Sequence, residues 1–268
     1  MICSWPSGHL LRLIGLVLSV TWLGSVQAET ESDKKFWPGV PGLGPGTCGP
    51  LVVMFKHGPF DYRNPPPQAI IENVEQNHFN GHFAAMQRGK DEYFGPGGGW
   101  VAAGFHYTLH AFPNHHRALK AMDDYSRKKS FVERPPGAGL PVECYFERAI
   151  RFRPEDVVVR FLYANYLEAR KRQRDADREL ALIVDDALAR PQLAYNIGLI
   201  YAKRGDFDKA REFARVAYRG GFSLPGLRGI LSQQGYWNPS IDESIEKPPD
   251  HTGQTARPEV QPEAQSQK

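Results

Sequence analysis

The chain is 268 residues long and nearly balanced in charge, with 33 Lys and Arg against 30 Asp and Glu and a formal net charge of +3. This small excess of positive charge does not favour a nucleic acid as the partner, since nucleic-acid-binding domains usually carry a strong basic excess. The three cysteines show no Cys-x-x-Cys spacing, so a redox-active thiol pair is not expected.

The first 28 residues are typical of a secretory signal peptide. Arg12 precedes an apolar run over residues 13–23 that is short for a membrane span, and Val26 and Ala28 stand at the two places that a signal peptidase reads. We therefore expect cleavage after Ala28 and a periplasmic or secreted protein. An uncleaved membrane anchor is the alternative, because the apolar run extends over residues 10–26 with few interruptions.

Residues 29–67 form a Gly- and Pro-rich lead-in that can continue neither a long helix nor a central strand. Cleavage of the signal would leave Cys48 and Cys144 as the two cysteines of the mature chain. In an oxidising compartment they most simply form one disulfide, although two buried free thiols are the alternative. A bond between them would close a loop of about a hundred residues, worth on the order of 4–5 kcal/mol in the chain-entropy model.

Helical spacing begins at residue 68. Apolar residues and one histidine fall close to a spacing of three to four residues, namely Ile70, Ile71, Val74, His78 and Phe79. A Gly-rich break covers residues 89–99, and residues 100–112 predict a second helix. We expect residues 68–114 to form a degenerate helical pair that caps the elements following it.

The segment after Asp123 repeats itself at a period of 34 residues. In the windows 123–156, 157–190 and 191–224, small or apolar residues share three places: Val142, Ala176 and Ala210; Phe146, Leu180 and Ala214; Ala149, Ile183 and Ala217. Such positions predict helix-turn-helix units in which small residues let two helices cross closely. The first helix of the first window is expected at about residues 115–129, displaced by an insertion at residues 133–139.

The third window resembles a tetratricopeptide repeat, with Gly198 at the helix crossing and Gly205 and Asp206 in the turn. The resemblance implies an all-α fold, a solenoid of about three helical hairpins over residues 115–224 with a capping helix in residues 225–245. Residues 246–268 are rich in Pro, Gln and Glu and predict a disordered tail.

A narrower resemblance covers about half of the chain. The motifs that carry it lie at residues 48–50, 57–63, 74–75, 78–79, 107–109, 112–119 and 142–150. Their order is similar to that in exported tetratricopeptide-repeat proteins of proteobacteria, whose function is not established. The resemblance implies a bacterial periplasmic setting and no particular reaction.

In the repeat family, the first helices of successive repeats line a concave groove. The resemblance carries this role to the following residues of the second and third repeats: Phe161, Asn165, Glu168, Tyr195, Asn196, Leu199 and Lys203. A groove in which aromatic rings flank amides suits an extended peptide, because an amide can pair with the peptide backbone. The expected function is therefore that of a non-enzymatic adaptor without a cofactor, which binds a segment of another envelope protein.

Histidines provide the main alternative. His78 and His82 stand four residues apart, and His106 and His110 repeat this spacing in the next predicted helix, so that each pair supplies half of a zinc site. A metal-binding or catalytic envelope protein centred on these four residues is therefore the rival to the adaptor.

A second alternative is an envelope-assembly factor that handles an anionic polysaccharide. Basic clusters at residues 127–129 and 170–174 provide charge for such an anionic partner. The same clusters also suit solvated helix ends, where cations are stabilised without a ligand.

Overall fold

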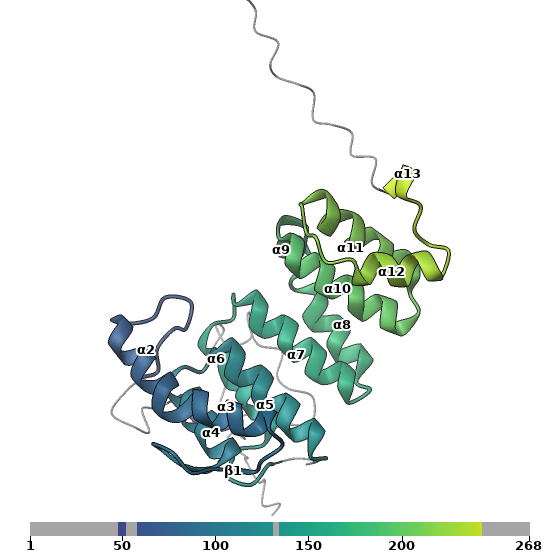
Figure 1. Cartoon of the computed structure of the whole chain (residues 1–268). Helices are drawn as coiled ribbons and strands as arrows, with labels where there is room; N and C mark the ends of the chain where they lie inside the picture. The colour runs from purple at the N-terminus through teal and green to yellow at the C-terminus, as the bar shows by residue number, and fades with distance from the viewer. Residues whose placement is uncertain (1–47, 52–57, 131–133, 243–268) are drawn as a thin grey trace, which may run out of the picture.

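The computed structural model describes residues 48–51, 58–130 and 134–242 (Figure 1). These residues are mostly helical, which confirms the all-α class. None of their helices combines the length and the apolar composition that crossing a membrane requires. The expected signal peptide at residues 1–28, residues 29–47 of the lead-in and the expected tail at residues 246–268 lie outside the described residues.

The amino-terminal part consists of two helical segments joined by a short hairpin. In chain order its elements are α2 (Gln68–Val74), the π-helical turn η1 (Glu75–Phe79), α3 (Asn80–Gln87), β1 (Glu92–Tyr93), β2 (Gly99–Trp100) and α4 (Val101–Ala111). The two strands are antiparallel, with Glu92 opposite Trp100, and they occupy the Gly-rich break that the sequence predicts as a loop. Helix α4 packs against both η1 and α3.

The middle part contains α5 (His116–Lys128), α6 (Val142–Phe152), α7 (Val157–Ala169) and α8 (Gln173–Ala181). Two of these helices, α5 and α7, begin at a side chain that accepts hydrogen bonds from the first backbone amides of the helix. The ring of His115 accepts from the amide of Ala118 at the start of α5, and the buried carboxylate of Asp156 accepts from those of Val158 and Val159 at the start of α7. Helix α5 therefore occupies the place expected for the first helix of the first window.

The carboxyl-terminal part contains α9 (Val184–Ala189), α10 (Pro191–Arg204), α11 (Phe207–Arg219), α12 (Gly226–Gln233) and α13 (Pro239–Asp242). Helix α10 begins with Pro191, whose missing N–H costs nothing at this position, and ends at Gly205 with a φ of 81°. The second helix of the second window is split into α8 and α9. The split follows the non-helical conformation of Ile183, whose φ is −123°.

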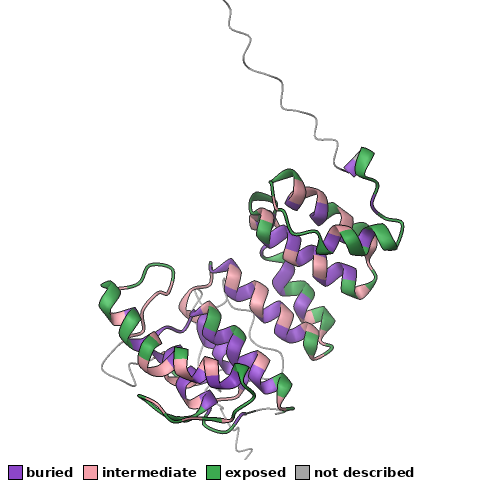
Figure 2. Cartoon of the chain, in the orientation of Figure 1, coloured by how far each residue is buried: buried purple, intermediate pink, exposed green. Residues whose placement is uncertain are grey.

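Buried side chains form one large core that extends from Phe79 to Trp237, along the inner faces of the helices in Figure 2. Small residues allow close packing where α10 meets α11. Ala210, Ala214 and Ala217 of α11 are fully buried, and a Cβ atom at Gly198 of α10 would lie 3.3 Å from the carbonyl oxygen of Ala210 and 2.5 Å from Cδ2 of Leu227 in α12. The residue types that recur at the period of 34 therefore serve packing.

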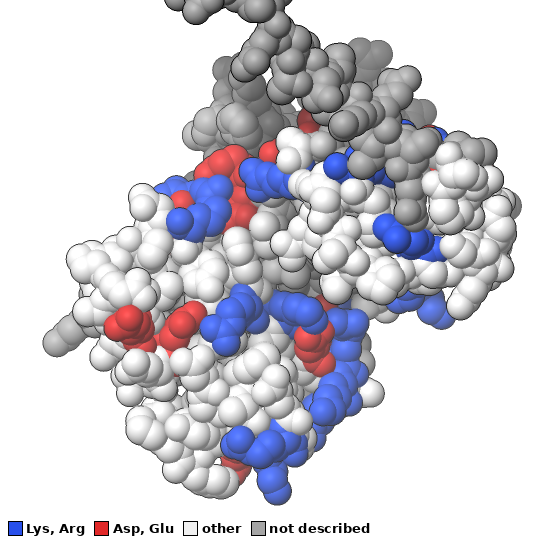
Figure 3. Space-filling model, turned by 45° about the horizontal axis from the view of Figure 1, so that its top comes forward, with Lys and Arg blue, Asp and Glu red and all other residues white. Residues whose placement is uncertain are grey.

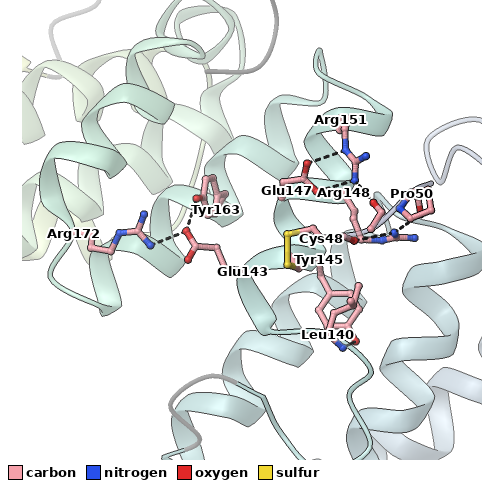
Figure 4. Close-up of a disulfide and its surroundings, with 12 residues drawn as sticks. Cys48, Pro50, Leu140, Glu143, Tyr145, Glu147, Arg148, Arg151, Tyr163 and Arg172 are labelled. Atoms are coloured by element: carbon pink, nitrogen blue, oxygen red, sulfur yellow. Dashed lines mark hydrogen bonds and ion pairs between the residues drawn. A yellow bond between two sulfur atoms is a disulfide. The ribbon is translucent and has the colours of Figure 1, made fainter. Parts of the chain in front are cut away.

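The expected disulfide is present between Cys48 and Cys144, whose Cα atoms are 5.0 Å apart. Both cysteines are buried. Two arginines of α6 secure the same segment (Figure 4): Arg148 donates to the carbonyl oxygens of Cys48 and Pro50 at 3.3 and 2.6 Å, and Arg151 donates to that of Gly49 at 2.7 Å. The chain ahead of α2 is thus fixed to α6 by one covalent bond and three hydrogen bonds.

Candidate functional site

A groove of about 660 Å³ lies between α5, α7 and α10, the first helices of the three predicted hairpins. Helix α7 packs against α5 and is followed along the chain by α8, α9 and α10 (Figure 1). The apolar residues that line the groove are Phe146, Val157, Val158, Phe161, Leu162, Ala169, Leu193 and Ile200. About half of the lining residues are therefore apolar, and the lining includes residues of four helices, α5, α6, α7 and α10.

Five of the seven residues expected in the groove line it. They are Phe161, Asn165, Glu168, Asn196 and Lys203. Tyr195 does not, because it is buried on another side of α10, where its ring lies 4.6 Å from that of Phe222. One step along a helix turns a side chain by about 100°, so Tyr195 and Asn196 face different neighbours. Leu199 is not among the lining residues either and packs against the core.

Polar groups in the groove are available to a ligand. The side chains of Gln192, Asn196 and Lys203 form no hydrogen bond or ion pair with another described residue, and Gln192 and Lys203 are exposed. Asn165 donates one hydrogen bond to the carbonyl oxygen of Phe161 within its own helix, at 3.0 Å. The arrangement offers both donors and acceptors beside apolar surface, as recognition of an extended backbone requires.

Both acidic residues of the groove are already paired with arginines. Glu168 forms an ion pair with Arg204, and Asp123 forms ion pairs with Arg170 at 3.0 Å and with Arg127 of the lining at 3.1 Å. Burial raises the pKa of Asp123, although its neighbouring arginines act in the opposite direction. The basic residues of the lining are Lys120, Arg127, Arg190 and Lys203. The lining therefore has two more basic than acidic residues, although Lys120, Arg127 and Arg190 are each paired with an aspartate.

The repeat alignment does not identify the residues that α5 contributes, which are Lys120, Asp123 and Arg127. Helix α5 begins 41 residues before α7, whereas α7 begins 34 residues before α10, so a fixed period misplaces α5. These three residues are spaced by three and then four positions, which puts them on one helical face. That spacing is the sequence signal that identifies them.

Each of the four histidines of the metal hypothesis forms a ring contact or a hydrogen bond with another residue of the protein. The His78 ring stacks on Tyr107 with centroids 3.6 Å apart, and His82 Nε2 lies 2.9 Å from the carbonyl oxygen of Gly97. His106 Nδ1 lies 2.7 Å from the hydroxyl of Tyr145.

His110 Nδ1 lies 2.9 Å from the carbonyl oxygen of His106, within α4. Burial, together with His110 and Arg148, lowers the pKa of His106 to about 4, which keeps this ring neutral at pH 7. Within residues 48–51, 58–130 and 134–242, no three His, Cys, Asp or Glu side chains are grouped so that they could hold a metal ion. The geometry of these residues gives the metal hypothesis no support.

Comparison with known proteins identifies no family. No protein-family model, no curated protein and no solved structure matches the chain. The class of protein that the coordinates define is an all-α chain with a groove between helices, and its function has to be inferred from that groove.

Proposed function

We propose that this chain is a non-enzymatic adaptor of the bacterial envelope, built as a tetratricopeptide-type stack of helical hairpins. In this proposal the groove between α5, α7 and α10 holds an extended segment of another envelope protein. The observation that carries the proposal is the groove itself, a space of about 660 Å³ that combines apolar side chains with unpaired amides.

The pairing of helices supports the repeat architecture. Helices α7 and α8 pack against each other, as do α10 and α11, and α5 packs against α6. Buried small or apolar residues stand at equivalent places in successive second helices, namely Val142, Ala176 and Ala210. This is the arrangement by which helical hairpins stack in solenoids.

The lining of the groove supports a peptide as the ligand. Phe161 and Leu193 offer apolar contact, while Asn196 and Gln192 are free to pair with backbone N–H and C=O groups. An extended peptide presents both kinds of group along its length. Because three hairpins make a short groove, we expect affinities on the order of micromolar.

The cysteines support a location outside the cytoplasm. The disulfide between Cys48 and Cys144 is buried and joins segments 96 residues apart in the sequence. Structural disulfides of this kind form in oxidising compartments such as the bacterial periplasm. The predicted signal peptide at residues 1–28 agrees with this location.

Selection from a random peptide library tests the proposal. The protein, purified with its disulfide intact, should enrich peptides that bind with a Kd on the order of micromolar in calorimetry. Replacing the exposed Ala169 of the groove by Trp should abolish this binding, because the indole ring fills the groove. The matched control is Ala181→Trp at the exposed end of α8, which should bind normally.

A milder variant tests the contribution of the amides. Asn196→Ala should weaken the binding of the selected peptides by about tenfold, which corresponds to the loss of one hydrogen bond of about 1.4 kcal/mol. Asn80→Ala, an exposed position at the start of α3, is the control. Equal affinities of Ala169→Trp and the unmodified protein would refute the groove as the binding site.

A further inference from the structure

Three groups of basic residues that are far apart in the sequence lie side by side. Arg170, at the end of α7, donates to Asp123 at 3.0 Å and to Ser126 at 3.2 Å, which brings it to the last turn of α5. That turn leads into Lys129, whose ammonium group lies 3.2 Å from the carbonyl oxygen of Gly89 and 3.0 Å from Asp91.

These contacts define a basic stripe, a name used here for Arg88, Lys90, Arg127, Lys128, Lys129, Arg170 and Lys171. Figure 3 shows Lys and Arg side chains gathered along one edge of the molecule, with few acidic side chains among them. The stripe joins the two basic clusters recognised in the sequence and adds a third from the turn after α3. The net charge of the whole chain, +3, does not reveal this local excess of basic residues.

Much of the charge of the stripe is unpaired. Arg88, Lys90, Lys128 and Lys171 are exposed, and their side chains form no hydrogen bond or ion pair with another described residue. Three acids beside the stripe are already engaged: Asp123 with Arg127 and Arg170, Asp124 with Lys120 and Arg127, and Asp91 with Lys129. An anionic partner would therefore meet cations that have no competing internal partner.

The stripe is continuous with the groove. Arg127 belongs to both, and Asp123, which also lines the groove, is bound by Arg170 of the stripe. A ligand that lies in the groove therefore reaches the stripe without leaving the surface of the protein. This continuity favours one extended ligand over a separate lipid or polysaccharide.

We propose that the ligand of the groove is an acidic peptide segment, with apolar residues in the groove and an adjoining run of Asp or Glu along the basic stripe. This inference rests on the proposed function and specifies the partner chemically. An extended chain advances about 3.3 Å per residue, so a run of three to five acidic residues spans about 10–17 Å beyond the groove.

The first experiment repeats the peptide selection with three proteins. The unmodified protein should enrich peptides in which Asp and Glu follow an apolar stretch. A variant with Lys128→Glu and Lys171→Glu should still enrich apolar peptides but without acidic residues. The control carries Lys209→Glu and Arg219→Glu on α11, which alters the net charge equally at a distance from the stripe.

The second experiment measures affinity by fluorescence anisotropy. The acidic peptide should bind the Lys128→Glu, Lys171→Glu variant about tenfold more weakly, as expected for the loss and reversal of two exposed ion pairs. Raising the NaCl concentration from about 50 to about 300 mM should weaken binding to the unmodified protein more than to this variant.

The outcomes separate the two proposals. Selected peptides without acidic residues would overturn the inference and leave the groove as a peptide site. Failure to select any peptide would overturn both. If the complete acidic peptide, or vesicles of phosphatidylglycerol and phosphatidylcholine, bind the Ala169→Trp variant as well as the unmodified protein, the stripe binds anions independently of the groove and the inference fails.

Discussion

Asp156 connects the start of α7 to the segments around it. Its buried carboxylate accepts hydrogen bonds from the first amides of α7 and from the side chain of Asn114, and lies 2.9 Å from His116 Nε2. Burial alone would raise the pKa of this carboxyl, but the hydrogen bonds from His116, Asn114 and the backbone outweigh it and lower the pKa. Because the folded pKa is depressed, the unfolded chain binds the proton more tightly, and Asp156 stabilises the fold above the unfolded pKa of about 3.9.

Asp156→Asn should therefore lower the free energy of unfolding by about 1–3 kcal/mol at pH 7. Asn still accepts from the helix amides, so the loss reports the charge and the hydrogen bonds that Oδ2 forms with Asn114 and His116, and not the helix cap. The difference between the variant and the unmodified protein should shrink as the pH falls through the folded pKa of Asp156, because protonation removes the same charge. Urea unfolding at pH 7 and at about pH 3 measures both values.

Asp185→Asn, in the exposed first turn of α9, is the control for this experiment and should change stability little at either pH. A loss at Asp156 that is equally large at both pH values would show that the charge of the carboxylate does not matter.

At the scale of elements, one ion pair joins the two helices of the second hairpin. Arg160 of α7 and Glu179 of α8 are 2.9 Å apart, and their side chains are only 7% and 6% exposed. Burial raises the pKa of Glu179, while Arg160 acts in the opposite direction. A buried pair of this kind is costly to break, because the remaining charge stays out of water.

Glu179→Ala should destabilise the protein by about 3–5 kcal/mol, since it removes the carboxylate and leaves the arginine buried. The double variant Arg160→Met, Glu179→Leu replaces both charges by apolar groups and should recover most of this loss. Thermal and urea unfolding of the two variants compare them directly. If the double variant is less stable than Glu179→Ala, the hydrogen bond of Arg160 to the carbonyl oxygen of Pro154 matters more than the pair.

The third hairpin depends on close packing. Ala210→Leu should cost about 1–3 kcal/mol, because α10 and α11 leave no room for a larger side chain. Ala181→Leu, the same change at an exposed position of α8, should be nearly neutral. Similar losses in both variants would mean that helix propensity, and not packing at the crossing, explains the effect.

For the whole molecule, the repeat pattern in the sequence is informative where packing restricts residue size. The small residues Gly198 and Ala210 predict the crossing of α10 and α11, because only such residues fit there. The pattern does not predict the split between α8 and α9, nor the strands in the Gly-rich segment. Those features depend on single backbone conformations, such as that of Ile183, and on tertiary contacts that leave no period in the sequence.

The candidate site, like the fold, could be predicted only in part from the sequence repeat. Helices α7 and α10 differ by the period of the repeat, so alignment finds most of their groove residues. The α5 residues do not follow the period. Tyr195 faces away from the groove because one step along the helix from Asn196 turns the side chain by about 100°. The basic stripe could not be predicted, since its three groups meet only through the contacts of Arg170 and Lys129.

The disulfide connects the whole amino-terminal part to the repeats. The chain between Cys48 and Cys144 contains every element from α2 to α5, and the bond therefore restricts the unfolded state over a sequence separation of 96 residues. Arg148 of α6 is buried, and burial lowers its pKa. Its hydrogen bonds to Cys48 and Pro50 give the guanidinium acceptors that it would otherwise lack there.

Replacing both cysteines by Ala should lower the free energy of unfolding by about 2–5 kcal/mol, mainly because the unfolded chain gains conformational freedom. A reducing agent should lower the stability of the unmodified protein towards that of the variant, and should leave the variant unchanged. Urea unfolding with and without reductant measures the effect, and alkylation followed by mass spectrometry verifies that the bond is reduced. An unmodified protein that is fully reduced yet keeps its urea midpoint would show that the arginine hydrogen bonds alone hold the segment, and that the bond adds no stability.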